Sequence, residues 1–293
     1  MEQSHKTVKN LVLEFRDKLG PIYSVQEITQ LTYILFEEHL GWKKTMVHLA
    51  FNDDIPLPAL MLFNNALEEL YTGKPIQYIL GKSWFNGMAL KVNQDVLVPR
   101  PETEELCSII KTDLAGKQMK AISILDIGTG SGCIAIDLKR FFAHAEVSAV
   151  DVSAGALDVA KENAISSQCA ISFIHADILN EKDWDHLGTY DLIVSNPPYV
   201  LEGEKLQMHN NVLQHEPGMA LYVSDDDPLL FYRVISGFAF SHLRPLASLY
   251  VEINEKFGRE ICQLTELQGF RDVKVMNDFF GKQRFVSAVL PEN

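Results

Sequence analysis

The chain has 293 residues, of which 47% are hydrophobic and 22% charged, the balance of a globular protein with a substantial core. Its formal net charge of −13 argues against broad, non-specific binding to nucleic acid, because such binding depends on Lys and Arg that neutralise phosphates. No apolar run reaches the roughly 20 residues that span a bilayer, and the four cysteines lack a C-x-x-C pair, so we expect no membrane attachment, disulfide framework or metal site.

Residues 1–82 are expected to form a small helical bundle. The start of the chain is polar and has no apolar secretory segment, which predicts a cytoplasmic protein. Apolar residues then recur at the spacing of amphipathic helices in the stretches TVKNLVLEFRDKL, SVQEITQLTYILFEEHL and LPALMLFNNALEELYTG. Ser24 is placed to cap the second helix, because Glu27 follows three residues later as in a capping box.

Residues 83–102 are interpreted as a β-hairpin linker between this bundle and a second domain at 103–293. Two short β-like runs lie on either side of VNQD (92–95), which is taken as the turn. A helix is expected to begin near Pro101, because proline is favoured at the first position of a helix and acidic residues follow it.

The second domain alternates short β-rich runs with helical stretches, which predicts an α/β fold built on a doubly wound, mostly parallel sheet. The runs are AISILDIG, EVSAVDV, ISFIHAD, YDLIVSN, ASLYVEIN, DVKVMND and RFVSAVL. Only FFGKQ joins the last two runs. This connection is too short for a parallel crossover, so the last strand should be antiparallel.

Three glycines follow the first β-rich run, in ILDIGTGSGCIAI. Gly128, Gly130 and Gly132 would let the backbone approach a ligand closely at the start of a helix. Asp151 ends the second run and can accept hydrogen bonds from the two hydroxyls of a ribose, as expected in an adenosine site. Asp177 is expected to end the third strand, beside the adenine.

The fourth run ends in a stiff loop, Asn196-Pro197-Pro198-Tyr199. Proline fixes φ and removes a backbone donor, so this loop presents carbonyl groups in fixed positions. The side-chain oxygen of Asn196 and the backbone oxygen of Pro197 could accept the two hydrogens of a planar –NH2 group, while Tyr199 stacks on it. The loop therefore indicates chemistry on an amide or aromatic amine and leaves the carrier of that group open.

The glycine spacing separates two kinds of adenosine cofactor. A dinucleotide fingerprint has its third glycine one position later than Gly132. The G-x-G-x-G pattern, with Asp126 two residues before it, resembles motif I of the S-adenosylmethionine-dependent methyltransferases. That resemblance implies S-adenosyl-L-methionine as cofactor, S-adenosyl-L-homocysteine as product, and a seven-stranded Rossmann-like sheet with the last strand antiparallel.

Several motifs in order resemble one family of these enzymes. They are PIQYILGKSWFNGMALKVNQDVLVPRPETEEL (75–106), LDIGTGSG, AVDVS, SNPPYV, HEPGMAL (215–221) and DFFGKQRFV. Across residues 75–290 they resemble the PrmC/HemK family of release-factor glutamine methyltransferases. The resemblance implies methyl transfer to the side-chain nitrogen of the glutamine in the GGQ motif of class-1 peptide-chain release factors, in support of translation termination.

The resemblance also implies roles for individual positions. Residues implied to line the cofactor are Gly128, Thr129, Gly130, Ser131, Gly132, Asp151, Asp177, Ile178, Asn196 and Arg100. Those implied to hold the substrate amide are Asn196, Pro197, Pro198 and Tyr199, with Phe85 (or its neighbour Trp84) closing the slot. Asn196, Pro197 and Tyr199 would be the catalytic group. Arg100 and Glu102 would organise the cofactor-side entrance, although PRPETE also reads as a simple helix start.

Two other functions compete with glutamine methylation. Methylation of an exocyclic amine in DNA or RNA would call for a basic recognition domain, which the net charge of −13 does not supply. A non-catalytic module that merely binds the cofactor fits poorly with an intact Asn196 loop. We therefore expect a monomeric enzyme with a release factor as partner, no nucleic-acid substrate and an N-terminal bundle that helps to dock the partner.

Overall fold

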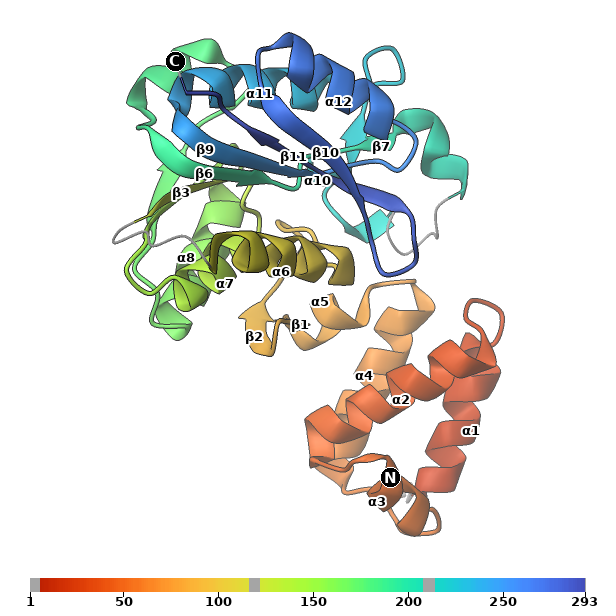
Figure 1. Cartoon of the computed structure of the whole chain (residues 1–293). Coiled ribbons are helices and arrows are strands. Elements are labelled where there is room, and N and C mark those ends of the chain that lie inside the picture. The colour runs from red at the N-terminus through yellow and green to blue at the C-terminus, as the bar shows by residue number, and fades with distance from the viewer. Residues whose placement is uncertain (1–5, 116–121, 208–213, 293) are drawn as a thin grey trace. The chain divides into compact units, whose positions relative to one another are not determined.

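The computed structural model describes residues 6–115, 122–207 and 214–292 (Figure 1). The chain divides into two compact units. Of the described residues, those up to 80 form one unit with 214 and 215, and the others form the second unit. No helix within the described ranges combines the length and the apolar character needed to cross a membrane.

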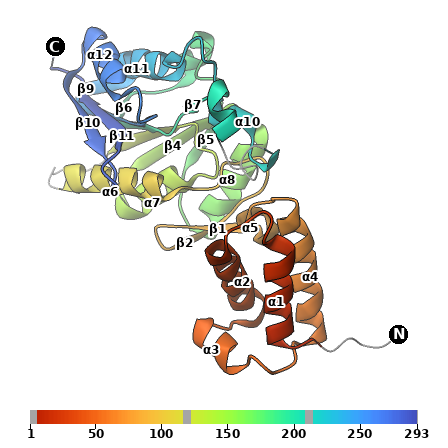
Figure 2. The same cartoon turned by 90° about the vertical axis from the view of Figure 1, so that its right-hand side faces the viewer.

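The first unit is helical, as its amphipathic patterns predict (Figure 2). Its helices are α1 (Val8–Leu19), α2 (Val25–Leu40), α3 (Lys44–Leu49), α4 (Leu57–Tyr71) and α5 (Ile76–Leu80). The capping box of α2 is confirmed: the hydroxyl of Ser24 accepts from the backbone N–H of Glu27, whose carboxylate accepts from the backbone N–H of Ser24. Phe15, Phe36 and Phe63 are fully buried and centre the core of the bundle.

The second unit begins with a hairpin of β1 (Lys82–Phe85) and β2 (Met88–Lys91). The prediction that VNQD forms its turn is wrong. The turn is Asn86-Gly87, with φ of 44° and 74°, and this pair of left-handed residues matches the twist of a two-residue hairpin. The hairpin packs on its own unit: Asn86 donates from its backbone N–H to Glu104 and from its side chain to Asp137.

A seven-stranded sheet forms the centre of this unit, and the predicted fold class is confirmed. Its strands, in sheet order, are β10 (Arg271–Asn277), β11 (Gln283–Val289), β9 (Leu243–Glu252), β6 (Tyr190–Ser195), β3 (Ser123–Ile127), β4 (Glu146–Asp151) and β5 (Ser172–His175). β11, the last strand, runs antiparallel to both of its neighbours, while β9, β6, β3, β4 and β5 pair in parallel. Two short strands, β7 (Val200–Leu201) and β8 (Tyr222–Val223), pair separately.

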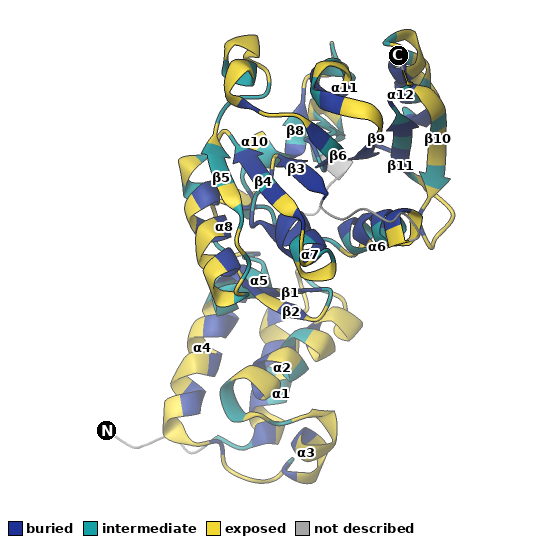
Figure 3. Cartoon of the chain, turned by 60° about the vertical axis from the view of Figure 1, so that its left-hand side comes forward, coloured by how far each residue is buried: buried dark blue, intermediate teal, exposed yellow. Residues whose placement is uncertain are grey.

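Helices cover both faces of the sheet (Figure 1). On one face lie α6 (Pro101–Ala115), α7 (Cys133–Phe141) and α8 (Ala154–Ser166), and on the other lie α11 (Leu230–His242) and α12 (Gly258–Leu267). The remaining described helices are short: η1 (Glu181–His186), η2 (Glu202–Gln207) and α10 (Gly218–Leu221). Because successive strand residues point to opposite faces, Phe285 joins one core and Val286 the other. The buried middle strands stand out in dark blue in Figure 3.

Candidate active site

A cavity of about 550 Å³ lies at the carboxyl edge of strands β3, β4 and β6. This edge is where ligands bind in doubly wound sheets, and the volume suits a ligand of nucleoside size. Segments after each of the three strands line it, as do Asp177–Leu179 after β5 and residues 94–97, 99 and 100. Apolar side chains dominate the lining, which includes Met219 and Phe231.

The glycine loop after β3 is held by backbone and side-chain hydrogen bonds. The N–H groups of Gly128 and Thr129 donate to the carbonyl oxygen of Val150, at 2.9 and 3.1 Å. Gly128 and Gly130 have φ of +71° and +53°, and a Cβ built on either one would meet no atom within 4 Å. Both glycines line the cavity with Thr129 and Ser131. The loop is thus fixed in a conformation that leaves open space beside its backbone.

Gly132 has a different task. It does not line the cavity, and a Cβ there would lie 3.2 Å from both Ala160 Cβ and Ile136 Cδ1. Its φ of +81° is also a left-handed conformation that disfavours other residues. The structure therefore assigns Gly132 to the close approach of α7 and α8.

Replacing Gly132 by alanine is expected to lower the free energy of unfolding by about 2–4 kcal/mol, as left-handed strain and overpacking act together. Gly281 offers a matched control, because it has the same φ of +81° but no atom within 4 Å of a built Cβ. Gly281→Ala should cost about 1–2 kcal/mol. Urea denaturation of the two variants measures the difference, and equal losses would show that helix packing at Gly132 contributes nothing.

Acidic side chains follow β4 and β5. Asp151 ends β4, as predicted, and its carboxylate accepts from the N–H groups of Gly130 and Ser153, each at 2.9 Å. Burial raises the pKa of Asp151. The third strand was predicted to run to Asp177 but ends at His175. Asp177 still lines the cavity, as does Ile178 beside it.

The Asn196 loop follows β6, which lies on one side of β3 in the sheet, whereas Asp177 follows β5 on the other side. The two therefore line opposite ends of the cavity. Asn196, Pro197 and Pro198 line the cavity. The side-chain nitrogen of Asn196 donates to Thr103 Oγ1 at 3.0 Å. Within the described part of the chain, no hydrogen bond ends on Asn196 Oδ1 or on the carbonyl oxygen of Pro197. Both oxygens therefore remain available as acceptors.

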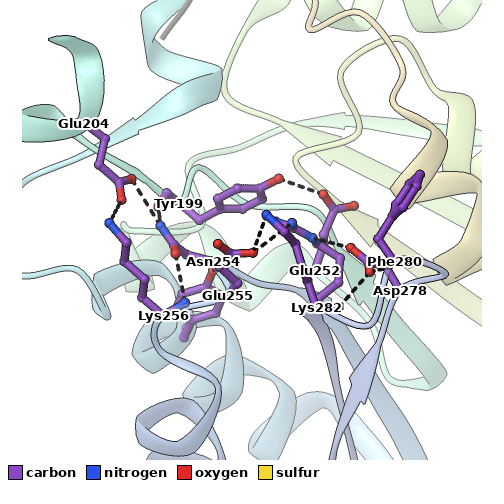
Figure 4. A network of polar contacts seen from close by, with 11 residues as sticks. Tyr199, Glu204, Glu252, Asn254, Glu255, Lys256, Asp278, Phe280 and Lys282 are labelled. Atoms are coloured by element: carbon purple, nitrogen blue, oxygen red, sulfur yellow. Dashed lines mark hydrogen bonds and ion pairs between the residues drawn. The ribbon is translucent and has the colours of Figure 1, made fainter. Parts of the chain in front are cut away.

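Tyr199 does not line the cavity, although it was predicted to hold the substrate. Its hydroxyl donates to Glu252 at 2.9 Å, and its backbone oxygen accepts from the side chain of Asn254 at 3.0 Å (Figure 4). Burial, followed by the charge of Glu252, raises the pKa of the Tyr199 hydroxyl. These contacts fix the end of the loop in place. The side chain of Tyr199 therefore supports the loop and does not face the cavity.

The structure also corrects the prediction for the residue that closes the substrate slot. Phe85 has no exposed surface, because it belongs to the core cluster that also holds buried residues of α6 and α7, and it does not line the cavity. Its neighbour Trp84 is 64% exposed but is not on the cavity either. Arg100 does line the cavity and pairs with the buried carboxylate of Glu216 at 2.6 Å.

Glu102 is the other predicted entrance residue, and it does not line the cavity. It belongs to the first turn of α6, as Glu104 does, which agrees with the simpler interpretation of PRPETE as a helix start. The side chain of Glu104 accepts from the backbone of Asn86 at 2.8 Å and so ties the helix to the hairpin.

Thr103 and Glu252 are site residues that the sequence reasoning missed. Thr103 is 2% exposed and lines the cavity beside Asn196. Glu252 has no exposed surface, and it accepts from Thr103 Oγ1 at 2.8 Å as well as from Tyr199. Burial raises the pKa of Glu252 to about 7, against the hydrogen bonds from Thr103 and Tyr199 that lower it. In the sequence, Thr103 stands within the PRPETE run and Glu252 is the acid of the run ASLYVEIN.

A second buried acid supports the glycine loop. Asp126 Oδ2 accepts from the hydroxyl of Thr129 at 2.6 Å and from the N–H of Ala135 at 3.2 Å. Burial raises the pKa of Asp126 to about 7. Asp126 Oδ1 and Ser131 Oγ are buried without a hydrogen-bond partner among the described residues. The described residues contain no group of His, Cys, Asp or Glu arranged to hold a metal ion.

Comparison with known proteins identifies the family. The models of two domains match: the PrmC N-terminal domain over residues 14–81 and the methyltransferase small domain over residues 105–217. The release factor glutamine methyltransferase of Flavobacterium psychrophilum is 42% identical to this chain, over 95% of the chain and 98% of the relative. The chain belongs to the release factor glutamine methyltransferase family. The resemblance found in its motifs is thereby confirmed.

Further relatives extend the same assignment. The release factor glutamine methyltransferase of Bacteroides thetaiotaomicron is 40% identical, over 93% of this chain and 96% of its own length. Among solved structures, a methyltransferase from Pyrococcus furiosus matches with a TM-score of 0.52 and 20% identity, over 78% of this chain and 99% of that one. The METTL16 methyltransferase domain matches with the same TM-score at 17% identity, over 71% and 90%. These structural matches show the methyltransferase fold.

Proposed function

We propose that the protein transfers a methyl group from S-adenosylmethionine to the side-chain amide nitrogen of the GGQ glutamine in class-1 peptide-chain release factors. The identity of 42% with a release factor glutamine methyltransferase, over nearly the full length of both chains, carries this proposal. The position of Asn196 and Pro197 on the cavity, each with an unused acceptor oxygen among the described residues, supports it.

The residues of the cavity fit the proposed cofactor. Gly128 and Gly130 leave open space for close approach to their backbone, and the buried Ser131 Oγ beside them lacks a partner among the described residues. A carboxylate has about four lone-pair sites. Asp151 uses two of these lone-pair sites to accept from the N–H groups of Gly130 and Ser153, and the others can accept from ribose hydroxyls. Ile178 offers an apolar wall, as expected for a contact to adenine rather than aromatic stacking.

The chain's own residues would act on the substrate amide. The bound cofactor supplies an electrophilic methyl group on a positively charged sulfur. An amide nitrogen is a poor nucleophile because its lone pair is delocalised into the carbonyl group. Asn196 Oδ1 and the Pro197 carbonyl oxygen would accept its two hydrogens and so favour a pyramidal nitrogen with more electron density in the transition state. The methylated nitrogen becomes acidic and loses its proton afterwards, so no general base is needed before attack.

The remaining assignments follow from this function. We infer that residues 1–82 help to dock the release factor and that the enzyme acts as a cytoplasmic monomer without a nucleic-acid substrate. The acidic net charge of −13 suits a basic protein partner better than a polyanion. Methylation of nucleic acid is the competing function.

Methyl transfer from labelled S-adenosylmethionine to recombinant release factor tests the proposal. We expect one methyl group per release factor, on the GGQ glutamine, and complete loss of label when that glutamine is changed to alanine. Mass spectrometry of the tryptic peptide locates the group. Equal labelling of the alanine variant would refute the proposed site of methylation, and label found only in DNA or RNA would establish the competing function.

A further inference from the structure

The amide of Asn196 must be held in one orientation if it is to accept a hydrogen bond from a substrate –NH2 group. An asparagine side chain offers an acceptor oxygen on one arm and a donor –NH2 on the other. Rotation by half a turn would present the donor to the substrate, and two –NH2 groups would then face each other. The fold must therefore contain a device that distinguishes the two orientations.

The register of the sheet places that device beside the loop. β6 pairs in parallel with β9, and Ser195 lies opposite Val251. Asn196 and Glu252 thus stand next to each other where the two strands end. Thr103, in the first turn of α6, bridges them: it donates to Glu252 Oε2 at 2.8 Å and accepts from Asn196 Nδ2 at 3.0 Å.

The direction of each hydrogen bond in this chain is fixed by the one before it. Above its pKa of about 7 the Glu252 carboxylate is ionised and can only accept, so the single proton of the Thr103 hydroxyl then points to Glu252. The Thr103 oxygen can then only accept, which requires the –NH2 arm of Asn196 on that side. The carbonyl arm is left for the cavity. Because Thr103 is 2% exposed and Glu252 fully buried, water has little access to compete for these bonds.

We propose that Thr103 and Glu252 are positioning residues that fix the side-chain carbonyl of Asn196 toward the cavity; the inference rests on the proposed function of that cavity. Neither residue touches the reacting atoms in this scheme. Tyr199 completes the arrangement by donating to the other oxygen of Glu252, at 2.9 Å (Figure 4). The same tyrosine belongs to the loop that it supports, so the network connects both ends of Asn196–Tyr199 to one carboxylate.

Thr103→Val removes the hydroxyl at nearly constant volume and is the first test. It should lower kcat for release factor by about 10–100-fold, as expected for partial loss of an oriented hydrogen-bonding group. KM and the Kd of S-adenosylmethionine should stay within about twofold. Thr103→Ser keeps the hydroxyl and should restore kcat to within about threefold of the wild type. Thr265→Val, which removes a buried helical hydroxyl away from the site, is the matched control.

Two kinetic results would overturn the proposal. Thr103→Val with wild-type kcat would show that the hydroxyl is dispensable. Equal losses in Thr103→Val and Thr103→Ser would assign the effect to packing. Should Thr103→Val fail to fold, Glu252→Gln takes its place, because it removes the requirement that Thr103 donate; its kcat should fall in the same direction, and an unchanged value would exclude a role for Glu252.

A measurement without release factor separates this inference from the proposed function. The side-chain amide resonances of Asn196 can be identified by their absence in Asn196→Ala. Their hydrogens should exchange with solvent at least about tenfold more slowly in the wild type than in Thr103→Val, because the bond to Thr103 protects them. Equal exchange rates would refute the positioning role. A wild-type enzyme that labels no release factor would refute the function alone.

Discussion

Replacing Asn196 by alanine should lower the turnover number for release factor by about 10²–10³-fold, the usual effect of losing one preorganised transition-state hydrogen bond. The affinity for S-adenosylmethionine should change by no more than about threefold, because the glycine loop and Asp151 lie on other strands of the cavity. Single-turnover rates with labelled cofactor measure the first quantity, and calorimetric titration measures the second.

The size of this effect depends on when the bond forms. A hydrogen bond of equal strength in the ground state and the transition state would alter KM and leave kcat unchanged. The hydrogen bond from the substrate amide to Asn196 is proposed to become stronger as the amide nitrogen becomes pyramidal and positively charged. Removing Asn196 should therefore lower kcat. Asn277→Ala, an exposed change at the end of β10 that does not line the cavity, serves as the control for handling and folding. Near-wild-type turnover in Asn196→Ala would refute the clamp.

The main features of the fold could be predicted because local patterns agree with the tertiary structure. All seven runs of β-rich sequence form the seven strands, and the short FFGKQ connection alone required β10 and β11 to be antiparallel. The capping box at Ser24 is likewise a local signal. Helices α3 and α5 were not predicted, since six and five residues are too few for a clear helical period.

The hairpin turn was misplaced although the sequence contained the better signal. Asn86-Gly87 is the residue pair most typical of a two-residue turn, and it stands between alternating runs. In the structure Asn93 and Asp95 do form a local turn, with the side chain of Asn93 accepting from the N–H of Asp95 at 2.9 Å.

Site residues could be predicted only where a residue of suitable chemistry directly follows a predicted strand. Gly128, Asp151 and Asn196 each follow a parallel strand, so the sheet brings them to one edge. Thr103 lies 93 residues from Asn196 and 149 from Glu252, and no spacing rule joins residues that far apart. Phe85 was assigned to the substrate slot by resemblance, but it is buried in a core cluster built from distant segments, which the sequence does not reveal.

Replacing Asp151 by alanine should weaken binding of S-adenosylmethionine by about 10–100-fold, since a hydrogen bond to a charged group contributes about 1.5–3 kcal/mol. Two losses combine in this variant. The acceptors proposed for the ribose hydroxyls disappear, and the N–H groups of Gly130 and Ser153 lose the carboxylate that holds them. The second loss makes the glycine loop less rigid, and it does so whether or not Asp151 itself touches the ligand.

Asp158→Ala is the matched control, because it removes a largely exposed carboxylate from the helix that follows Asp151 and should leave cofactor affinity unchanged. Asp151→Asn distinguishes the two losses. The asparagine oxygen can replace only one of the two carboxylate oxygens that accept from backbone N–H groups, and the asparagine –NH2 group must then face the other N–H. We therefore expect Asn to bind the cofactor nearly as poorly as Ala. Wild-type affinity in both variants, measured by calorimetry, would place the ribose elsewhere than beside β4.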